Sequence, residues 1–282
     1  MIDINSVQKN AKNLKQIITK EDIMTQARDL FNKSWDIAFN LFDTTEQNRI
    51  RHKESMEYLD TNPHKLKKHT LEYRRKQYLK YWDEKGIDIN SGPEDKKQFI
   101  AKQETHVRPE TIRDYIALFG SDLKGIKVLD LGCGTGKYMP LLSIALKELG
   151  ADVFAIDAKY TPELDKMGIK YENMNLNETY QFEYNPSFFK GNDIIIARSF
   201  LGGGLHAESK LARWGSNQKE FEQYKKIIQK VQDVNGKEAI YELDDSLELF
   251  FEGENGTEGL TRTFGEKIYQ SPETGKTFYF HK

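Results

Sequence analysis

Cysteine is nearly absent from the chain, which has 282 residues and a single cysteine, Cys133. One cysteine excludes an intrachain disulfide and any metal site built from several cysteines, and we expect no metal site. The sequence also lacks an apolar run long enough to span a membrane, and its first residues show no basic patch followed by an apolar stretch. We therefore expect a soluble, cytoplasmic protein without a membrane partner.

A strong excess of charge of one sign is lacking too. The formal net charge is −2, which argues against general attraction to nucleic acid. Aromatic residues make up 12% of the chain, which favours a globular protein with a proper core over a disordered one. Residues 49–80 depart from the charge balance, with ten Lys or Arg against four acids. That stretch fits a surface for RNA or for a phosphorylated substrate, and it equally fits the solvated side of ordinary helices.

The most informative segment is 127–138, Lys-Val-Leu-Asp-Leu-Gly-Cys-Gly-Thr-Gly-Lys-Tyr. Its apolar run stops at three alternating glycines, Gly132, Gly134 and Gly136, and a helix-capable stretch follows at roughly 138–149. This pattern predicts a buried parallel strand, a tight glycine turn against which a ligand can lie, and a helix. A P-loop would need Gly-Lys-Ser/Thr, and a dinucleotide fingerprint would place its third glycine one residue later, so neither pattern fits.

Strands and helices alternate along the second half of the chain. Strands are expected at 127–132, 152–157, about 170–174, 193–199 and 238–243, and the clearest helix is Lys219–Val234. This alternation predicts an α/β protein with a doubly wound, mostly parallel sheet. The tail, Leu260–Gln270 and Lys276–His281, predicts an antiparallel hairpin.

The first part of the chain reads as helical. Apolar residues recur at helical spacing over residues 22–43, and residues 50–85 continue the pattern. Pro109 then stands in the first turn of an amphipathic helix. We expect residues 1–107 to form a helical cap, lid or dimer contact in front of a core at 108–282, and a homodimer is compatible with this arrangement.

The run Leu-Asp-Leu-Gly-Cys-Gly-Thr-Gly resembles the first motif of class I, Rossmann-like methyltransferases that depend on S-adenosylmethionine (SAM). The resemblance covers roughly residues 108–282 and implies a seven-stranded sheet closed by a terminal hairpin. It also implies that the glycine loop passes under the methionine part of SAM, while an acid at the end of the second strand holds the ribose hydroxyls. Asp157 ends the second expected strand, 21 residues after Gly136. The alternatives are a Rossmann-like domain that binds NAD and one that binds nothing.

Ligands of open α/β sheets lie beyond the carboxyl ends of the strands, which places the candidate cofactor residues. Asp130, inside the first strand, either accepts backbone N–H bonds that shape the loop or reaches the SAM amino group through water. Asn175 stands where the family often has an acid beside the adenine. The expected cofactor residues are Asp130, Gly132, Cys133, Gly134, Gly136, Asp157, Ala158, Asn175, Leu176 and Arg198.

Three side chains are the candidates for catalysis. His206 follows a glycine triplet after the fourth strand, where a histidine of near-neutral pKa can act as a general base. The alternative is a histidine of an ordinary surface loop. Glu242 and Asp244, at the end of the fifth strand, can orient a hydroxyl or pair with an amine, and they can equally cap the next helix.

Two features that the sequence lacks reduce the range of methyl acceptors to be expected. The fourth strand is not followed by the Asn/Asp-Pro-Pro-Tyr-like run common in enzymes that methylate exocyclic amines or glutamine amides. No second cysteine is available for methylation of pyrimidine carbon 5. We expect a SAM-dependent O-methyltransferase acting on a polar small molecule, phosphorylated or sugar-type molecules included. The alternatives are an RNA or protein methyltransferase that uses the basic N-terminal face, and a SAM-binding module without catalysis.

Overall fold

The chain forms two compact units in a computed structural model. The first unit combines Met1–Ser34 with Val107–Lys282, and the second is Trp35–His106. The expected core, 108–282, lies within the first unit. The structure describes residues 2–18, 21–42, 107, 109–133, 140–157, 162–174, 176, 187–197, 218–243, 258–271 and 274–282.

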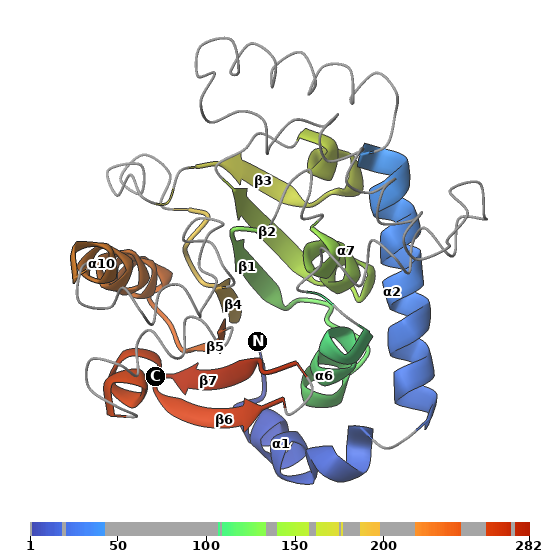
Figure 1. Ribbon diagram of the computed structural model, residues 1–282, viewed down its shortest axis with the longest axis horizontal. Coiled ribbons are helices and arrows are strands. Elements are labelled where there is room, and N and C mark those ends of the chain that lie inside the picture. The colour runs from blue at the N-terminus through green and yellow to red at the C-terminus, as the bar shows by residue number, and fades with distance from the viewer. Residues whose placement is uncertain are drawn as a thin grey trace, which may run out of the picture. The chain divides into compact units, whose positions relative to one another are not determined.

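The first unit is built on a seven-stranded sheet with the strand order β3-β2-β1-β4-β5-β7-β6 (Figure 1). The strands are β1 (Lys127–Leu131), β2 (Asp152–Asp157), β3 (Lys170–Asn173), β4 (Ile194–Ala197), β5 (Ala239–Leu243), β6 (Glu266–Gln270) and β7 (Thr277–His281). The strands β1 to β5 pair in parallel, whereas β7 is antiparallel to both β5 and β6. The α/β class and the mostly parallel sheet with an antiparallel terminal pair are therefore confirmed, and each parallel strand lies within its expected range.

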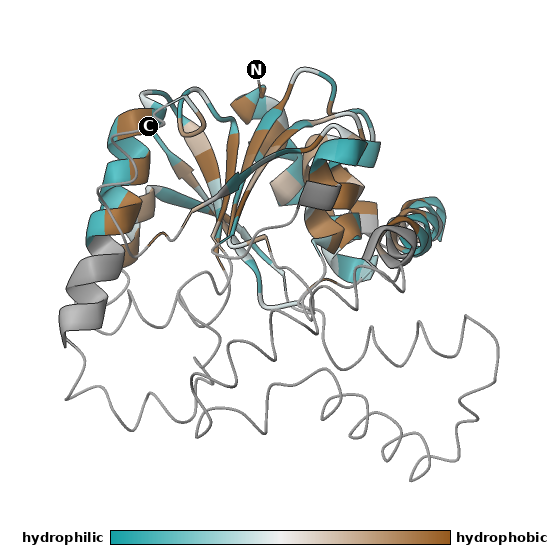
Figure 2. Ribbon diagram, turned by 90° about the horizontal axis from the view of Figure 1, so that it is seen from above, coloured by the Kyte–Doolittle hydropathy of each residue, from teal (hydrophilic) through white to brown (hydrophobic). Residues whose placement is uncertain are grey.

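Helices lie on both sides of this sheet. Besides a helical stretch at residues 258–264, the described helices are α1 (Ile4–Ile18), α2 (Glu21–Phe42), α6 (Pro109–Phe119), α7 (Leu141–Glu148), α10 (Gln218–Asn235) and the 3-10 helix η2 (Pro162–Met167). In both overall views α10 lies on one side of the strands, and α6 and α7 lie on the other (Figures 1 and 2). The central strands β1, β4 and β5 are buried along nearly their whole length. Their sequences are correspondingly apolar, which is typical of strands covered on both faces.

The side of the sheet that faces α10 carries an apolar core. Alternate residues of each strand point to this side, so Leu129 and Leu131 contribute from β1 while Asp130 points to the other side. The helix contributes Ile227, Ile228 and Val231 at helical spacing. The buried cluster comprises Leu129, Leu131, Ile156, Met174, Leu176, Phe189, Ile195, Ala197, Ile227, Ile228, Val231, Ala239, Tyr241, Leu243, Leu260, Phe264 and Tyr279.

On the other side of the sheet, α6 is fastened by one polar contact and by aromatic packing. The Tyr115 hydroxyl donates a hydrogen bond to the carboxylate of Glu242 in β5, and both side chains are fully buried. The Tyr115 ring also meets Phe278 of β7 edge-on, with 5.5 Å between ring centroids. Helix α1 packs against α6, where the Asn10 side-chain amide donates to the Leu118 carbonyl at 3.0 Å. The first N-terminal helix is thus part of the same compact unit as the sheet.

The C-terminal tail differs from the sequence expectation at its start. Residues 258–264 form a helix, whereas Leu260–Gln270 was expected to be one arm of a hairpin. The spacing of Leu260 and Phe264 explains the difference, because residues four apart share one helical face and both enter the apolar core. Gly265 ends this helix with φ +84°, and a Cβ there would lie 1.9 Å from the Phe280 carbonyl oxygen. The hairpin itself is confirmed as β6 and β7.

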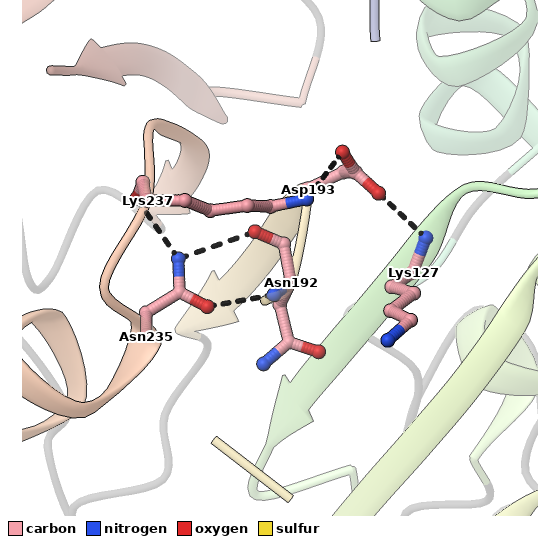
Figure 3. A network of polar contacts seen from close by, with 5 residues as sticks. All are labelled: Lys127, Asn192, Asp193, Asn235 and Lys237. Carbon is pink, nitrogen blue, oxygen red and sulfur yellow. Dashed lines mark hydrogen bonds and ion pairs between the residues drawn. The ribbon is translucent and has the colours of Figure 1, made fainter. Parts of the chain in front are cut away.

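A buried polar network ties the elements together at the amino ends of the parallel strands (Figure 3). The Asn235 amide, at the end of α10, accepts from the Asn192 N–H at 2.7 Å and donates to the carbonyls of Asn192 and Lys237. The Asp193 carboxylate accepts from the Lys127 N–H at 3.0 Å and from the Lys237 ammonium at 2.7 Å. One helix end and the starts of β1, β4 and β5 are therefore held in a common register.

We expect Asn235→Ala to lower the free energy of unfolding by about 2–4 kcal/mol, because buried backbone groups lose their partners. Urea unfolding followed by circular dichroism measures the change. Asp233→Ala is the matched control on the same helix, since Asp233 is exposed and accepts only a surface hydrogen bond from Gln229. The control should stay within about 0.5 kcal/mol of the unchanged protein. Equal effects of the two changes would contradict the role given to Asn235.

Candidate functional site

The candidate site lies where the carboxyl ends of the parallel strands meet. From β1 the chain continues to β2 and β3 on one side, and the later strands β4 and β5 lie on the other side of β1. The direction of winding thus changes between β1 and β4. Ligands of open parallel sheets bind in the crevice outside the carboxyl ends at such a switch point. The residues that follow β1 and β2 are therefore the first to consider.

The turn after β1 is held tightly against the neighbouring strand. The N–H groups of Gly132 and Cys133 both donate to the Ile156 carbonyl of β2, at 2.8 and 3.0 Å. Gly132 has φ +73°, a left-handed conformation that is strained for residues with a side chain. The turn requires glycine at this position, as the sequence pattern predicted. Its backbone comes to lie beside the end of β2, where the next residue is Asp157.

The charges of two carboxylates from neighbouring strands act on the Cys133 thiol. Asp157 is the last residue of β2, and its side chain is partly exposed. Burial raises the pKa of the Cys133 thiol well above its ordinary value, and the charges of Asp130 and then Asp157 raise it further, against a smaller lowering by a backbone hydrogen bond. The thiol is therefore protonated near neutral pH and is a poor nucleophile. The turn combines partly exposed residues with a negative electrostatic environment.

Asp130 is anchored to the helix that follows the turn. Its side chain is 4% exposed, and one carboxylate oxygen accepts a hydrogen bond from the Ser143 hydroxyl of α7 at 2.6 Å. The sequence predicts backbone N–H groups or a water-bridged ligand as partners of Asp130, and Ser143 is a partner that it does not predict. A serine three residues into a helix carries no sequence signal of such a contact, because the contact depends on how the helix packs on β1.

Glu242 is placed differently from a residue on the rim of a site. Its carboxylate is fully buried under α6 and holds the Tyr115 hydroxyl. This contact joins a strand to a helix that lies more than a hundred residues earlier in the chain. The structure thus gives Glu242 a part in packing, and the catalytic role expected for it stays a prediction.

The remaining expected site residues divide into two groups. Leu176 is buried together with Met174, Leu131 and Ile156 in the apolar core beneath the turn. Its expected contact with a cofactor stays a prediction. Gly134, Gly136, Ala158, Asn175, Arg198, His206 and Asp244 lie outside the described residues.

The described part of the chain offers no group of three or more His, Cys, Asp or Glu side chains that could hold a metal ion. None of the helices described is long and apolar enough to cross a membrane. Comparison with known proteins gave no match to a family model, to a curated protein or to a solved structure. The function is therefore inferred from the residues of the site itself.

The surroundings of Cys133 predict how the thiol reacts. Because Cys133 is the single cysteine, N-ethylmaleimide labels one position, and mass spectrometry measures its rate. We expect labelling at pH 7 to be slow, and the rate to keep rising with pH beyond the point where an ordinary cysteine levels off, since the raised pKa keeps the thiolate fraction small. Asp157→Asn removes one of the two negative charges, so it should lower the thiol pKa and speed labelling at pH 8.

Asp152→Asn is the matched control, because Asp152 begins the strand that Asp157 ends. It should leave the labelling rate unchanged. If Asp157→Asn and the unchanged protein react at the same rate across the pH range, the carboxylate does not act on the thiol.

Proposed function

We propose that the chain is a SAM-dependent methyltransferase with a doubly wound, Rossmann-like core, and that SAM lies over the Gly132–Cys133 turn. The observation that carries the proposal is the turn pinned to the Ile156 carbonyl, with Asp157 at the end of the same strand. The turn lies at the switch point of the sheet, where open α/β folds bind their ligands. The resemblance of the segment from Leu129 to Gly136 to the first motif of the family adds to this support.

The charges around the turn support SAM over a nucleotide with phosphate groups beside β1. Two carboxylates near one thiol attract hydroxyl and ammonium donors, and they repel phosphate oxygens at close range. A carboxylate at the position of Asp157 can accept both hydroxyls of a ribose, a geometry that rejects a 2′-phosphate. SAM carries a ribose, an ammonium and a sulfonium, and no phosphate. NAD, whose pyrophosphate would lie against this turn, fits the charges less well.

The protein's own part in the reaction is to hold two partners in line. Bound SAM would supply an activated methyl group, so the site must align an acceptor and help remove its proton. Our proposed acceptor is a hydroxyl of a polar small molecule, phosphorylated or sugar-type molecules included, with His206 as the base and Asp244 as a further candidate. An RNA or protein acceptor at residues 49–80 and a SAM-binding module without catalysis are the alternatives. A cytoplasmic location belongs to the same proposal.

Cofactor binding is tested by isothermal titration with SAM and with its demethylated product. We expect binding of both in the micromolar range and none of NAD. Asp157→Ala should weaken SAM binding by about 1.5–3 kcal/mol, the contribution of a hydrogen bond to a charged group. Asp152→Ala, at the other end of β2, should not. Bound SAM should also protect Cys133 from N-ethylmaleimide.

The titration has two informative failures. If Asp157→Ala binds SAM as tightly as the unchanged protein does, Asp157 does not bind the ribose hydroxyls. Absence of SAM binding by the unchanged protein would reject the proposed function.

The chemical step is tested with labelled SAM and a fractionated cell extract, asking which fraction gains the methyl group. With that acceptor, His206→Ala should lower kcat by about 10²–10⁴-fold, the usual effect of losing a general base. Its SAM affinity should stay within a few tenths of a kcal/mol, about the size of the coupling usually found between distant sites. Near-normal turnover in this variant would transfer the role to Asp244 or show that the acceptor needs no base.

A further inference from the structure

The hydrogen bond between Asp130 and Ser143 joins the two ends of the glycine-rich connection. Asp130 lies in β1 two residues before Gly132, and Ser143 lies in the first turn of α7. The two side chains are 4% and 0% exposed, and 2.6 Å separates the hydroxyl from the carboxylate oxygen. Hydrogen bonds from hydroxyl to carboxylate are short and strong when buried. The contact therefore fixes where β1 ends relative to where α7 begins.

The contact also places a negative charge, the Asp130 carboxylate, at the beginning of α7. Pro140, which precedes the helix, provides no side-chain cap, and the first turn contains no acidic residue. A carboxylate near the amino end of a helix interacts favourably with the helix dipole. Asp130, bonded to the third residue of α7, brings such a charge from the neighbouring strand. The same carboxylate thus serves both the strand and the helix that flank the connection.

We propose that Ser143 is a positioning residue, which holds Asp130 and thereby sets the Gly132–Cys133 turn for its ligand. Where that ligand is SAM, the inference rests on the proposed function. Asp130 then acts through Ser143 and not by its own contact with SAM. The turn has two anchors on β2, the N–H groups bonded to Ile156, and the Asp130–Ser143 contact is a third anchor on the side of α7.

Removal of the Ser143 hydroxyl should change the reactivity of the Cys133 thiol. Without the hydroxyl, the Asp130 carboxylate loses a contact that holds it in place, and it can turn away from the thiol. The negative charge that helps to keep Cys133 protonated then acts on the thiol less strongly. Cys133 labelling therefore reports on the contact without any ligand.

The first experiment compares Ser143→Ala with Ser34→Ala by the rate of N-ethylmaleimide labelling between pH 7 and pH 10. Ser34 is an equally buried serine whose hydroxyl donates to the Leu30 carbonyl within α2. We expect Ser143→Ala to label about 3- to 10-fold faster at pH 8, the range that one hydrogen bond supports, and Ser34→Ala to match the unchanged protein. Alanine is favourable in helices, and thermal unfolding verifies that both variants are folded. No difference between Ser143→Ala and the unchanged protein would overturn the proposal.

The second experiment measures SAM affinity in Ser143→Ala, in Asp130→Ala and in the double variant. Each single change removes the same contact, so each should weaken SAM binding about tenfold, and the double variant should be little weaker than either one. Losses that add in the double variant would show that Asp130 contacts the ligand itself and would overturn the proposal. If the unchanged protein does not bind SAM, the proposed function fails, and the labelling experiment still decides the role of Ser143.

Discussion

The two hydrogen bonds accepted by the Ile156 carbonyl are the constraint on which the rest of the candidate site depends. They draw the backbone of Gly132 and Cys133 onto β2 at the point where β1 ends. Regular pairing between β1 and β2 ends at Leu131 and Ile156, so this carbonyl extends the pairing by a turn. The positive φ of Gly132 is the local condition for such a turn, and an alanine there would strain it. The Ile156 carbonyl therefore determines where the turn lies and which backbone conformation it adopts.

Once the turn is placed, its electrostatics follow from the strand register. Asp130 pairs with Ala155, two residues before Asp157, so the two carboxylates come from adjacent strands close to the same edge. Both charges act on Cys133, and the pKa of its thiol is raised by burial first and then by the two carboxylates. The site is therefore suited to hydroxyl and ammonium donors and lacks an activated thiol. The Ser143 hydroxyl donates a hydrogen bond to the buried carboxylate of Asp130. Asp157 is the more exposed of the two acids.

The sequence predicted the sheet well, since runs such as Ile194–Ala197 are apolar on both faces and occur in few other settings. It failed at residues 258–264, where Leu260 and Phe264 fit a helix as well as part of a strand. The contacts that it missed join distant residues: Tyr115 with Glu242, and Ser143 with Asp130. A strand pattern tells which face a side chain is on, and it does not tell which helix residue will meet it there. Helix packing decides these pairings, so the buried position of Glu242 was beyond reach of the sequence.

The two edges of the sheet use their polar residues in opposite ways. At the amino ends of the parallel strands, the side chains of Asn235 and Asp193 bind backbone atoms and the Lys237 ammonium. Such groups fasten strands and have little capacity left for a ligand. At the carboxyl edge, Asp157 keeps a partly exposed side chain beside a turn whose conformation is already set by Ile156. A ligand that binds there meets a prearranged backbone and an accessible acid, so little ordering remains to be done on binding. The two ends are linked through β1, because its first residue binds Asp193 in the amino-end network and its other end leads into the turn bound to Ile156.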